Sequence, residues 1–206
     1  MASTKTWQLG TGTAQVFPAS GQDIVRPVIL VGDKEEGPTD FDQFEAGIDH
    51  PSYPFLSELH ARGFDLILLG FNNGNASLKD HAKAVQEGII QANAERTGND
   101  PLIVGGIGRG ALAARYALAQ MERSKIDHAT SIYYSYNGAA PSPEEGETLE
   151  QLGSWPMRPH LFKLDSGDFH SELDGEDFHE TKAGDPNEDG SLITKELGSW
   201  LLDQLR

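Results

Sequence analysis

A turn built almost entirely from glycine joins a short apolar run to a helical pattern near the middle of the chain. Residues 106–110 read Gly-Ile-Gly-Arg-Gly, after the apolar run 101–105 and before a helix expected at 109–123. Such a turn brings strand and helix too close for side chains, and its central residue takes a strained, positive φ. A serine at that centre is a nucleophile for acyl transfer, in the pattern G-x-S-x-G. Here the centre is Gly108, which supplies no nucleophilic oxygen.

Glycine-rich turns between a strand and a helix also bind phosphate groups, which is the alternative interpretation. A dinucleotide-binding turn has the pattern G-x-G-x-x-G, whereas the glycines here are spaced by two and Ala111 follows Gly110. A phosphate loop of the Walker type would need a Lys followed by Ser or Thr, and the sequence has none at this place. The turn alone does not decide between these interpretations, so the surrounding segments carry the argument.

The segments around the turn alternate between apolar runs and helical patterns. Strands are expected at 13–17 (an edge strand), 26–32, 64–71, 101–105, 130–136 and 160–165, with a short one near Phe178. Helices are expected at 54–62, 77–96, 109–123, within 141–153 and at 191–205. This alternation predicts an α/β fold with a mostly parallel central sheet and helices on both faces. We expect residues 1–206 to form a single domain, because no repeat or linker divides them.

Three stretches of the sequence resemble bacterial lipases and esterases of the α/β-hydrolase superfamily. Residues 112–118, LAARYAL, resemble the LVARYAL that begins the helix after the nucleophile in those proteins. Residues 63–74 resemble an upstream strand and turn of that family, and residues 126–136 resemble the strand that follows the helix. The resemblance covers about residues 26 to 140, and it implies the α/β-hydrolase fold with Gly108 at the nucleophile position.

The sequence departs from the family pattern where the chemistry should be. After the strand at 130–136 such lipases commonly carry D-x-P-H, but residues 137–140 read Asn-Gly-Ala-Ala. The segment between Ala140 and His160 is short, which predicts a reduced or absent lid. An engineered Ser-to-Gly change would explain Gly108 but not residues 137–140. A degenerate hydrolase that has lost its serine nucleophile therefore fits the sequence better.

The resemblance also implies places for the other catalytic groups. The acid is expected just after the strand at 160–165, at Asp168 or Asp165. The base is expected between the last strand and the last helix, at His179, with His170 as the second choice. Acids at strand ends and histidines in polar loops are also common without any catalytic role, so each of these residues has a structural alternative.

The oxyanion hole and the pocket follow from the same comparison. The backbone N–H of Arg109 and that of a residue near Asp33 are the expected donors, since the loop after Gly32 is the usual second source. The expected pocket residues are Gly32, Asp33, Ile107, Arg109 and Tyr136. Asp33 and Glu35 beside such a hole would repel an oxyanion, which is a further reason to expect no acyl transfer.

A second motif lies near the end of the chain. Residues 185–196 match the calcium-loop pattern D-x-[DN]-x-[DN]-G-x5-E without a mismatch. The ligands would be Asp185, Asn187, Asp189, the Ser191 carbonyl and Glu196. The alternative is a capped helix start, with acids near the positive end of the helix dipole. The sequence thus predicts either a Ca²⁺ ion or no metal, and it gives no sign of an organic cofactor.

Composition limits the partners of the protein. The chain has 32 Asp and Glu against 16 Lys and Arg, a formal net charge of −16, so binding to nucleic acid is not expected. No Cys is present, which excludes thiolate chemistry. No membrane span is expected, and no signal peptide is visible in residues 1–17, so a cytoplasmic location is the default expectation.

Three functions remain after this reading. The first is a pseudo-hydrolase that binds a small apolar or acyl-type ligand or serves as a non-hydrolytic subunit, with a protein partner or a second copy covering an open site. The second is a lyase, isomerase or cyclase that works by acid/base chemistry in the same pocket. Its candidate proton carriers are Tyr133, Tyr134, Tyr136, Asp33, His170 and His179. The third is a serine ester hydrolase inactivated by a Ser-to-Gly change.

Overall fold

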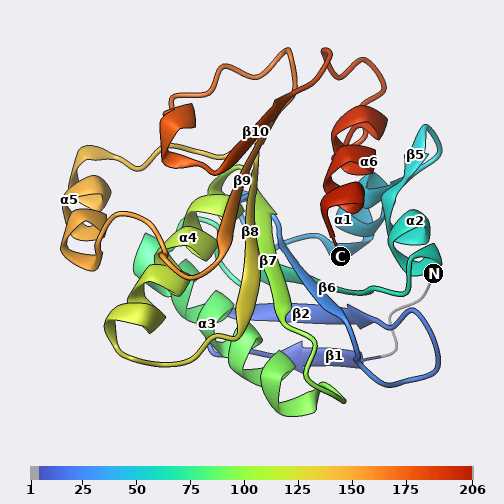
Figure 1. The fold of residues 1–206 in the computed structure, drawn as a ribbon, viewed down its shortest axis with the longest axis horizontal. Coiled ribbons are helices and arrows are strands. Elements are labelled where there is room, and N and C mark those ends of the chain that lie inside the picture. The colour runs from blue at the N-terminus through green and yellow to red at the C-terminus, as the bar shows by residue number, and fades with distance from the viewer. Residues whose placement is uncertain (1–4, 206) are drawn as a thin grey trace.

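The structure, a computed structural model, describes residues 5–205. Residues 1–4, part of the segment 1–17 in which no signal peptide was visible, and residue 206 lie outside the described residues. One eight-stranded sheet runs through these residues, in the spatial order β1-β2-β6-β3-β7-β8-β9-β10 (Figure 1). The strands are β1 (Lys5–Gln8), β2 (Gly12–Phe17), β3 (Pro27–Val31), β6 (Asp65–Phe71), β7 (Leu102–Ile107), β8 (Thr130–Tyr136), β9 (His160–Asp165) and β10 (Glu180–Ala183).

The sheet is parallel from β6 to β10, and β1 and β2 are antiparallel to their neighbours. The predicted mostly parallel sheet is therefore confirmed. The strand expected at 13–17 is not an edge strand, because β2 lies between β1 and β6. Strand β1 was not predicted, because only Trp7 of its four residues is buried and no alternating pattern results. A separate small hairpin joins β4 (Asp49–His50) to β5 (Tyr53–Pro54).

Helices cover both faces of the sheet, as expected. The helices are α1 (Phe41–Ile48), α2 (Phe55–Ala61), α3 (Leu78–Glu95), α4 (Arg109–Arg123), α5 (Pro143–Leu152) and α6 (Lys195–Gln204), with a short 3₁₀ turn η1 (Gly175–Asp177). The apolar sides of α3 and α4 share one buried cluster, which Leu149 of α5 joins. Those of α1, α2 and α6 share the cluster on the opposite face (Figure 1).

The central strands are apolar without interruption because both of their faces are covered. In β3, Ile29 and Val31 point to the α3 and α4 side, while Val28 and Leu30 point to the α1, α2 and α6 side. All five residues of β3 are buried. This explains why the apolar runs alone indicated the strands so well.

Two helices differ from the sequence prediction. The segment of α1 was not predicted as a helix, because only Phe44 and Ile48 of its eight residues are buried. Its start is fixed by Asp40, whose side chain caps the backbone N–H groups of residues 42 and 43. The last helix begins at Lys195 instead of 191, because Thr194 is its N-cap.

The carboxyl ends of the parallel strands bring three segments to one edge of the sheet. The loop after β3 begins at Gly32, the glycine turn follows β7, and Asn137 follows β8. Ligands of open α/β sheets bind at this edge. Within residues 5–205 no helix is both long and apolar enough to cross a bilayer.

Candidate functional site

The glycine turn has the backbone geometry that the sequence predicted. Strand β7 ends at Ile107, α4 begins at Arg109, and Gly108 between them has φ 55° and ψ −121°. A Cβ on Gly106 would lie 2.6 Å from the backbone N of Ala111, and one on Gly110 would collide with the carbonyl oxygen of Gly32. The flanking glycines are therefore required by the close approach of strand and helix.

The side chain of Asp33 lies directly over this turn. Its Oδ1 accepts hydrogen bonds from the backbone N of Arg109 at 2.7 Å and from the backbone N of Lys34 at 2.8 Å. The sequence prediction named the N–H of Arg109, just after the glycine turn at 106–110 (the elbow), and an N–H from the loop after Gly32 as oxyanion donors. In the structure a carboxylate of the protein itself accepts hydrogen bonds from two such N–H groups.

The same carboxylate also occupies the space that a side chain at position 108 would need. A Cβ on Gly108 would lie 2.5 Å from Cγ of Asp33 and closer still to its Oδ2. A serine at 108 therefore cannot coexist with Asp33 in its present position. The glycine at one position and the carboxylate at the other are sterically coupled.

The positive end of α4 stabilises this carboxylate. The Arg109 N–H belongs to the first turn of a 15-residue helix, and negative charge is favourable there. Asp33 is exposed at the mouth of the site, so its charge also retains contact with water. The arrangement is thus a carboxylate on a helix N-terminus with two backbone hydrogen bonds to its Oδ1.

An ion pair holds α5 beside the elbow. The guanidinium of Arg109 forms a two-pronged contact with the Glu145 carboxylate, with Nη1 to Oε2 at 2.9 Å. Glu145 also accepts the backbone N–H of Ser142 at 2.9 Å, which completes a capping box at the start of α5. Hydrogen bonds from Arg109, together with that of Ser142, lower the pKa of Glu145 from its ordinary 4.5 to about 2. The short segment before His160 is therefore an ordered helix fixed to the elbow.

Asn137 anchors the other side of the elbow. It has a positive φ of 46°, a conformation that Asn tolerates better than most residues. Its Oδ1 accepts the backbone N–H of Ser166 at 2.9 Å, and its Nδ2 donates to Ser166 Oγ at 2.9 Å. Ala139 N donates to the Gly108 carbonyl oxygen at 3.0 Å. The residues at 137–140 thus serve to tie the ends of β8, β9 and the elbow together.

A cavity of about 340 Å³, which we call the elbow cavity, opens beside Asp33. It is lined by Gly32, Asp33, Glu35, Thr39, Gln43, Phe44, Gly47, Ile107, Gly190 and Leu192. Of the expected pocket residues, Gly32, Asp33 and Ile107 line this cavity, and Arg109 contributes through the hydrogen bond from its backbone N to Asp33. Tyr136 does not line it: this side chain is buried, and its hydroxyl accepts the backbone N–H of Thr194 at 3.0 Å.

The histidines expected as the base are not brought to the elbow. His179 lies at the amino end of β9, where its Nδ1 accepts the Leu161 N–H at 2.9 Å and its backbone N donates to the Leu161 carbonyl oxygen. The elbow is at the carboxyl end of the same sheet. His179 stacks on His160 with the ring centres 4.4 Å apart. His170 is an exposed residue of the loop after β9, and neither histidine lines the cavity.

The two candidate acids take different roles. Asp165 at the end of β9 pairs with Lys163, with Nζ to Oδ2 at 3.1 Å. Asp168 is exposed and accepts the backbone N–H of Asn187 at 3.0 Å, and hydrogen bonds from Asn187 and Ser166 lower its pKa. Both acids therefore have structural partners, and the structure brings neither of them to a histidine at the elbow.

The tyrosines of β8 are part of the core. Tyr133 donates its hydroxyl hydrogen to the Ala111 carbonyl oxygen at 2.8 Å, and Tyr134 donates to that of Ile29 at 3.1 Å. Burial raises the pKa of both hydroxyl groups well above the ordinary value, and it also raises the pKa of Tyr136. All three hydroxyl groups are engaged with the backbone, Tyr133 and Tyr134 as donors and Tyr136 as an acceptor, and none of the three lines the cavity.

The calcium-type loop is not arranged as a metal site. Glu196 pairs with Lys182, with Nζ to Oε1 at 2.7 Å, and its Oε2 accepts the backbone N–H of Asp185 at 3.0 Å. Asn187 directs its amide nitrogen, a donor, to the Ser191 carbonyl oxygen at 2.7 Å. No group of three or more His, Cys, Asp or Glu residues in the described part of the chain could hold a metal ion, and Asp189 joins none. The expected Ca²⁺ therefore finds no support, because its ligands are engaged with one another and with Lys182.

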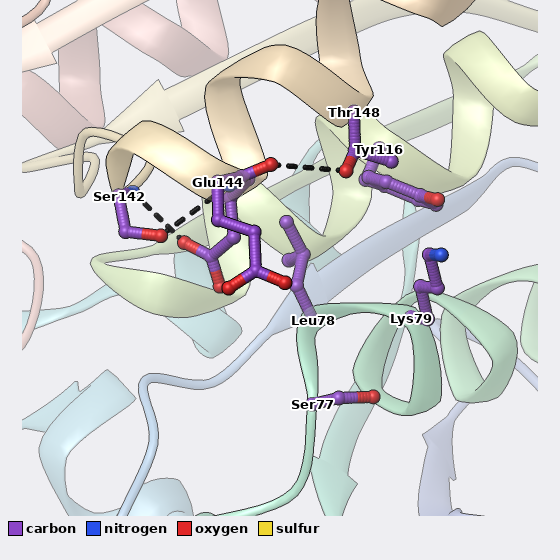
Figure 2. A pocket seen from close by; sticks show the side chains of 8 residues that line it. Ser77, Leu78, Lys79, Tyr116, Ser142, Glu144 and Thr148 are labelled. Carbon is purple, nitrogen blue, oxygen red and sulfur yellow. Dashed lines mark hydrogen bonds between the residues drawn. The ribbon is translucent and has the colours of Figure 1, made fainter.

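A second cavity of about 260 Å³ lies between the starts of α3 and α5. Figure 2 shows Ser77 and Lys79 at the start of α3 on one side and Ser142 and Glu144 at the start of α5 on the other, with Leu78 between them. Thr148 donates its hydroxyl hydrogen to the Glu144 carbonyl oxygen at 3.0 Å. The charged side chains that line this cavity are Lys79, Glu144 and Glu145. Glu145 also pairs with Arg109, so the cavity lies on the other side of that ion pair.

Comparison with solved structures identifies the architecture. A lidless α/β serine hydrolase from Xanthomonas campestris superposes with a TM-score of 0.61 at 12% identity, over 100% of this chain and 92% of that one. A Pyrobaculum calidifontis esterase gives a TM-score of 0.64 at 9% identity, over 98% of this chain and 84% of that one. The chain has the α/β-hydrolase fold.

A third structure supports the same conclusion. A lipase/esterase from Lactobacillus plantarum has a TM-score of 0.60 at 10% identity, covering 98% of this chain and 99% of that one. No protein-family model matches the sequence. A search of curated protein sequences finds no relative either. The likeness is thus one of fold, and at identities of 9 to 12% it carries no assignment of activity.

The sequence prediction placed Asp33 beside the expected oxyanion donors, but it did not predict that the Asp33 carboxylate would accept their hydrogen bonds. The signal that could have found this was the coincidence of two features: a glycine at the nucleophile position and an aspartate directly after the strand 26–32. A carboxylate needs donors and space, and Gly108 provides the space. Only the register of β3 against β7, in which Val31 pairs with Gly106, brings the two together.

Proposed function

We propose that this chain is a degenerate lipase- or esterase-like α/β-hydrolase that binds a small ligand in the elbow cavity and does not hydrolyse esters. The observation that carries the proposal is the Asp33 carboxylate, which rests on the backbone N–H groups of Arg109 and Lys34. Gly108 beneath it has no side chain to attack a carbonyl group. Both parts of acyl-transfer chemistry, nucleophile and oxyanion stabilisation, are therefore missing together.

Electrostatics argue in the same direction. An ester could use the oxyanion hole only by displacing Asp33, and the tetrahedral oxyanion would then form beside the displaced carboxylate and Glu35. Nearby negative charges raise the energy of the anionic transition state, which hydrolases lower with hydrogen-bond donors. The cavity itself remains open and of useful size for a small ligand. A binding role, alone or as a subunit of a larger assembly, uses what the site retains.

Acid/base catalysis of another kind receives less support. The tyrosine hydroxyl groups proposed as proton carriers are engaged with Ala111, Ile29 and Thr194 in the core. The histidines proposed for that role do not line the cavity. Asp33 is the one candidate of that set at the cavity, and its Oδ1 is already held by two backbone donors.

Hydrolysis of short p-nitrophenyl esters tests the proposal. We expect no turnover above the buffer rate from the natural chain or from Gly108→Ser, because Asp33 blocks both the new side chain and the oxyanion hole. The informative variant is the double change Asp33→Gly with Gly108→Ser, which frees both. Because neither His170 nor His179 lies at the cavity to act as a base, acylation of the introduced serine would be slow. Its detection by mass spectrometry in the double variant alone would support the steric coupling.

Ester turnover by the natural chain that is lost in Asp33→Asn would overturn the proposal, since Asp33 would then be a working catalytic group. Asn keeps the Oδ1 acceptor, so this variant should fold normally. Turnover by Gly108→Ser alone would contradict the blocking role of Asp33. A matched control is Asp203→Asn, on the surface of α6 and remote from the elbow.

A further inference from the structure

The elbow cavity combines an apolar wall with an acidic rim. Phe44, Ile107 and Leu192 supply hydrocarbon surface, and two of the three, Phe44 and Ile107, are otherwise buried in the core. Asp33 and Glu35 lie at the mouth. The residues that line the cavity in the described part of the chain include no Lys, Arg or His. The cavity is therefore apolar at its wall and negative at its entrance.

The Asp33 carboxylate is only half used by the protein. Both of its hydrogen bonds, from Arg109 N and Lys34 N, go to Oδ1 within residues 5–205. Its Oδ2 lies over Gly108, where no side chain competes for it. Neither Asp33 nor Glu35 forms an ion pair within those residues. One fixed acceptor oxygen with a full charge behind it is thus available to a ligand donor.

These features select one chemical class. A carboxylate ligand would meet two like charges at the entrance. A bare metal ion would need several oxygen ligands and would leave the apolar wall unused. A cation that carries N–H donors and a hydrocarbon chain matches both parts, since an ammonium group can donate to Oδ2 while the chain covers Phe44 and Leu192. The net charge of −16 concentrates such cations around the molecule.

We propose that the elbow cavity binds an organic ammonium ion with a short apolar chain, with Asp33 Oδ2 as the acceptor for the ammonium group and the Phe44, Ile107 and Leu192 surface as the contact for the chain. This proposal rests on the binding role given above. It replaces the small apolar or acyl-type ligand expected from the sequence with a cationic one at the same place. The carboxylate that blocks ester chemistry then serves as the hydrogen-bond acceptor for the ligand.

Isothermal titration with three matched probes tests this assignment. Hexylammonium, hexanol and hexanoate share one chain and differ in the charge of the head group. At an ionic strength near 0.15 M, where long-range attraction is screened, we expect hexylammonium to bind most tightly, hexanol more weakly and hexanoate not at all. Equal binding of all three would overturn the proposal, and so would no binding of hexylammonium to the natural chain.

Variants separate the site from the general charge of the protein. Asp33→Asn keeps the Oδ1 acceptor and removes the charge, so we expect hexylammonium to bind at least about fivefold more weakly, the equivalent of about 1 kcal/mol. Leu192→Ala should weaken hexylammonium and hexanol by similar factors, because it removes apolar surface. The control Glu144→Gln removes the same charge at the other cavity and should leave binding unchanged.

Equal weakening by Asp33→Asn and Glu144→Gln would show a diffuse charge effect and would contradict the assignment. Thermal unfolding of each variant verifies that it is folded. The ester assay described above reports on the hydrolytic question by itself. Failure of ammonium binding with no ester turnover would thus remove this inference and leave the non-hydrolytic role intact, while ester turnover would remove the latter.

Discussion

The elbow and the loop at 185–196 match their motifs in different respects: the elbow in its backbone geometry and the loop in its residue types. At the elbow the backbone is preserved, with Gly108 at φ 55° between β7 and α4, but the reactive side chain is absent. In the loop every side chain of the calcium pattern is present, but Glu196 pairs with Lys182 and Asn187 caps a carbonyl oxygen. A tight backbone turn is dictated locally by glycines, whereas a metal shell requires all of its ligands to converge. Motif letters therefore predicted geometry better than chemistry.

The largest effect that we expect is on the free energy of unfolding, and it differs between a glycine of the elbow and a glycine of the loop. Gly108→Ala introduces a Cβ into a positive φ and into the Asp33 carboxylate, so we expect the free energy of unfolding to fall by about 3 kcal/mol. Gly190→Ala also meets a positive φ, of 72°, but in open space, and should cost about 1 kcal/mol. Denaturant titration measures both values.

A double-mutant cycle sharpens that comparison. Asp33→Gly should return at least about 1 kcal/mol of the loss in Gly108→Ala and none of the loss in Gly190→Ala. Equal costs at the two glycines would show that backbone strain alone determines them. The steric coupling between positions 33 and 108 would then be disproved.

A smaller effect concerns the ion pair that supports the elbow. The pKa of Glu145 is lower in the folded chain, about 2, than its ordinary 4.5, so its contribution to stability is present above about pH 4.5 and is lost as the pH falls through about 2. Glu145→Gln should lower the free energy of unfolding by about 1 kcal/mol at pH 7, since the pair is partly exposed. The difference between the two proteins should shrink to near zero at pH 2.

The matched control is Glu144→Gln, which changes the neighbouring residue of the same helix. Its pH dependence should follow that of the natural chain. A constant difference between Glu145→Gln and the natural chain from pH 7 to pH 2 would contradict the role assigned to the Arg109 pair.

The smallest expected effect concerns the loop. Addition of 1 mM Ca²⁺, on the order of the dissociation constants of weak extracellular sites, should leave the unfolding temperature unchanged. Glu196 and Asn187 are already engaged, and their present partners would have to be displaced first. A Ca²⁺-dependent rise in the unfolding temperature that disappears in Asp185→Ala would restore the metal site and reverse the comparison between the two regions.

Most of the fold was predictable because its signals are local. The run at 64–71 and the helix start at Ser77 agree with β6 and α3 to within one residue. β1 and α1 were missed because each buries too few residues to produce a clear period. The antiparallel edge was misjudged for a related reason: a strand pattern shows which residues are buried but not which neighbours cover its edges.

The site was less predictable because it depends on distant segments meeting. The elbow pattern predicted Arg109 N as a hydrogen-bond donor, yet its bond to the Asp33 carboxylate depends on the register of β3 and β7. His179 was placed by its order along the chain, whereas its position is determined by pairing with Leu161 at the amino end of β9. The order of residues along the chain shows which elements they connect, but it does not show at which end of a strand a side chain will lie.

The contact between Asp33 and Gly108 also imposes an order on evolutionary change. A serine that arises first at 108 meets an occupied position, with Cγ of Asp33 at 2.5 Å from its Cβ. Loss of the carboxylate first leaves an empty hole that tolerates the later serine. A serine at position 108 is therefore tolerated only after position 33 has changed, as long as Asp33 keeps its present position.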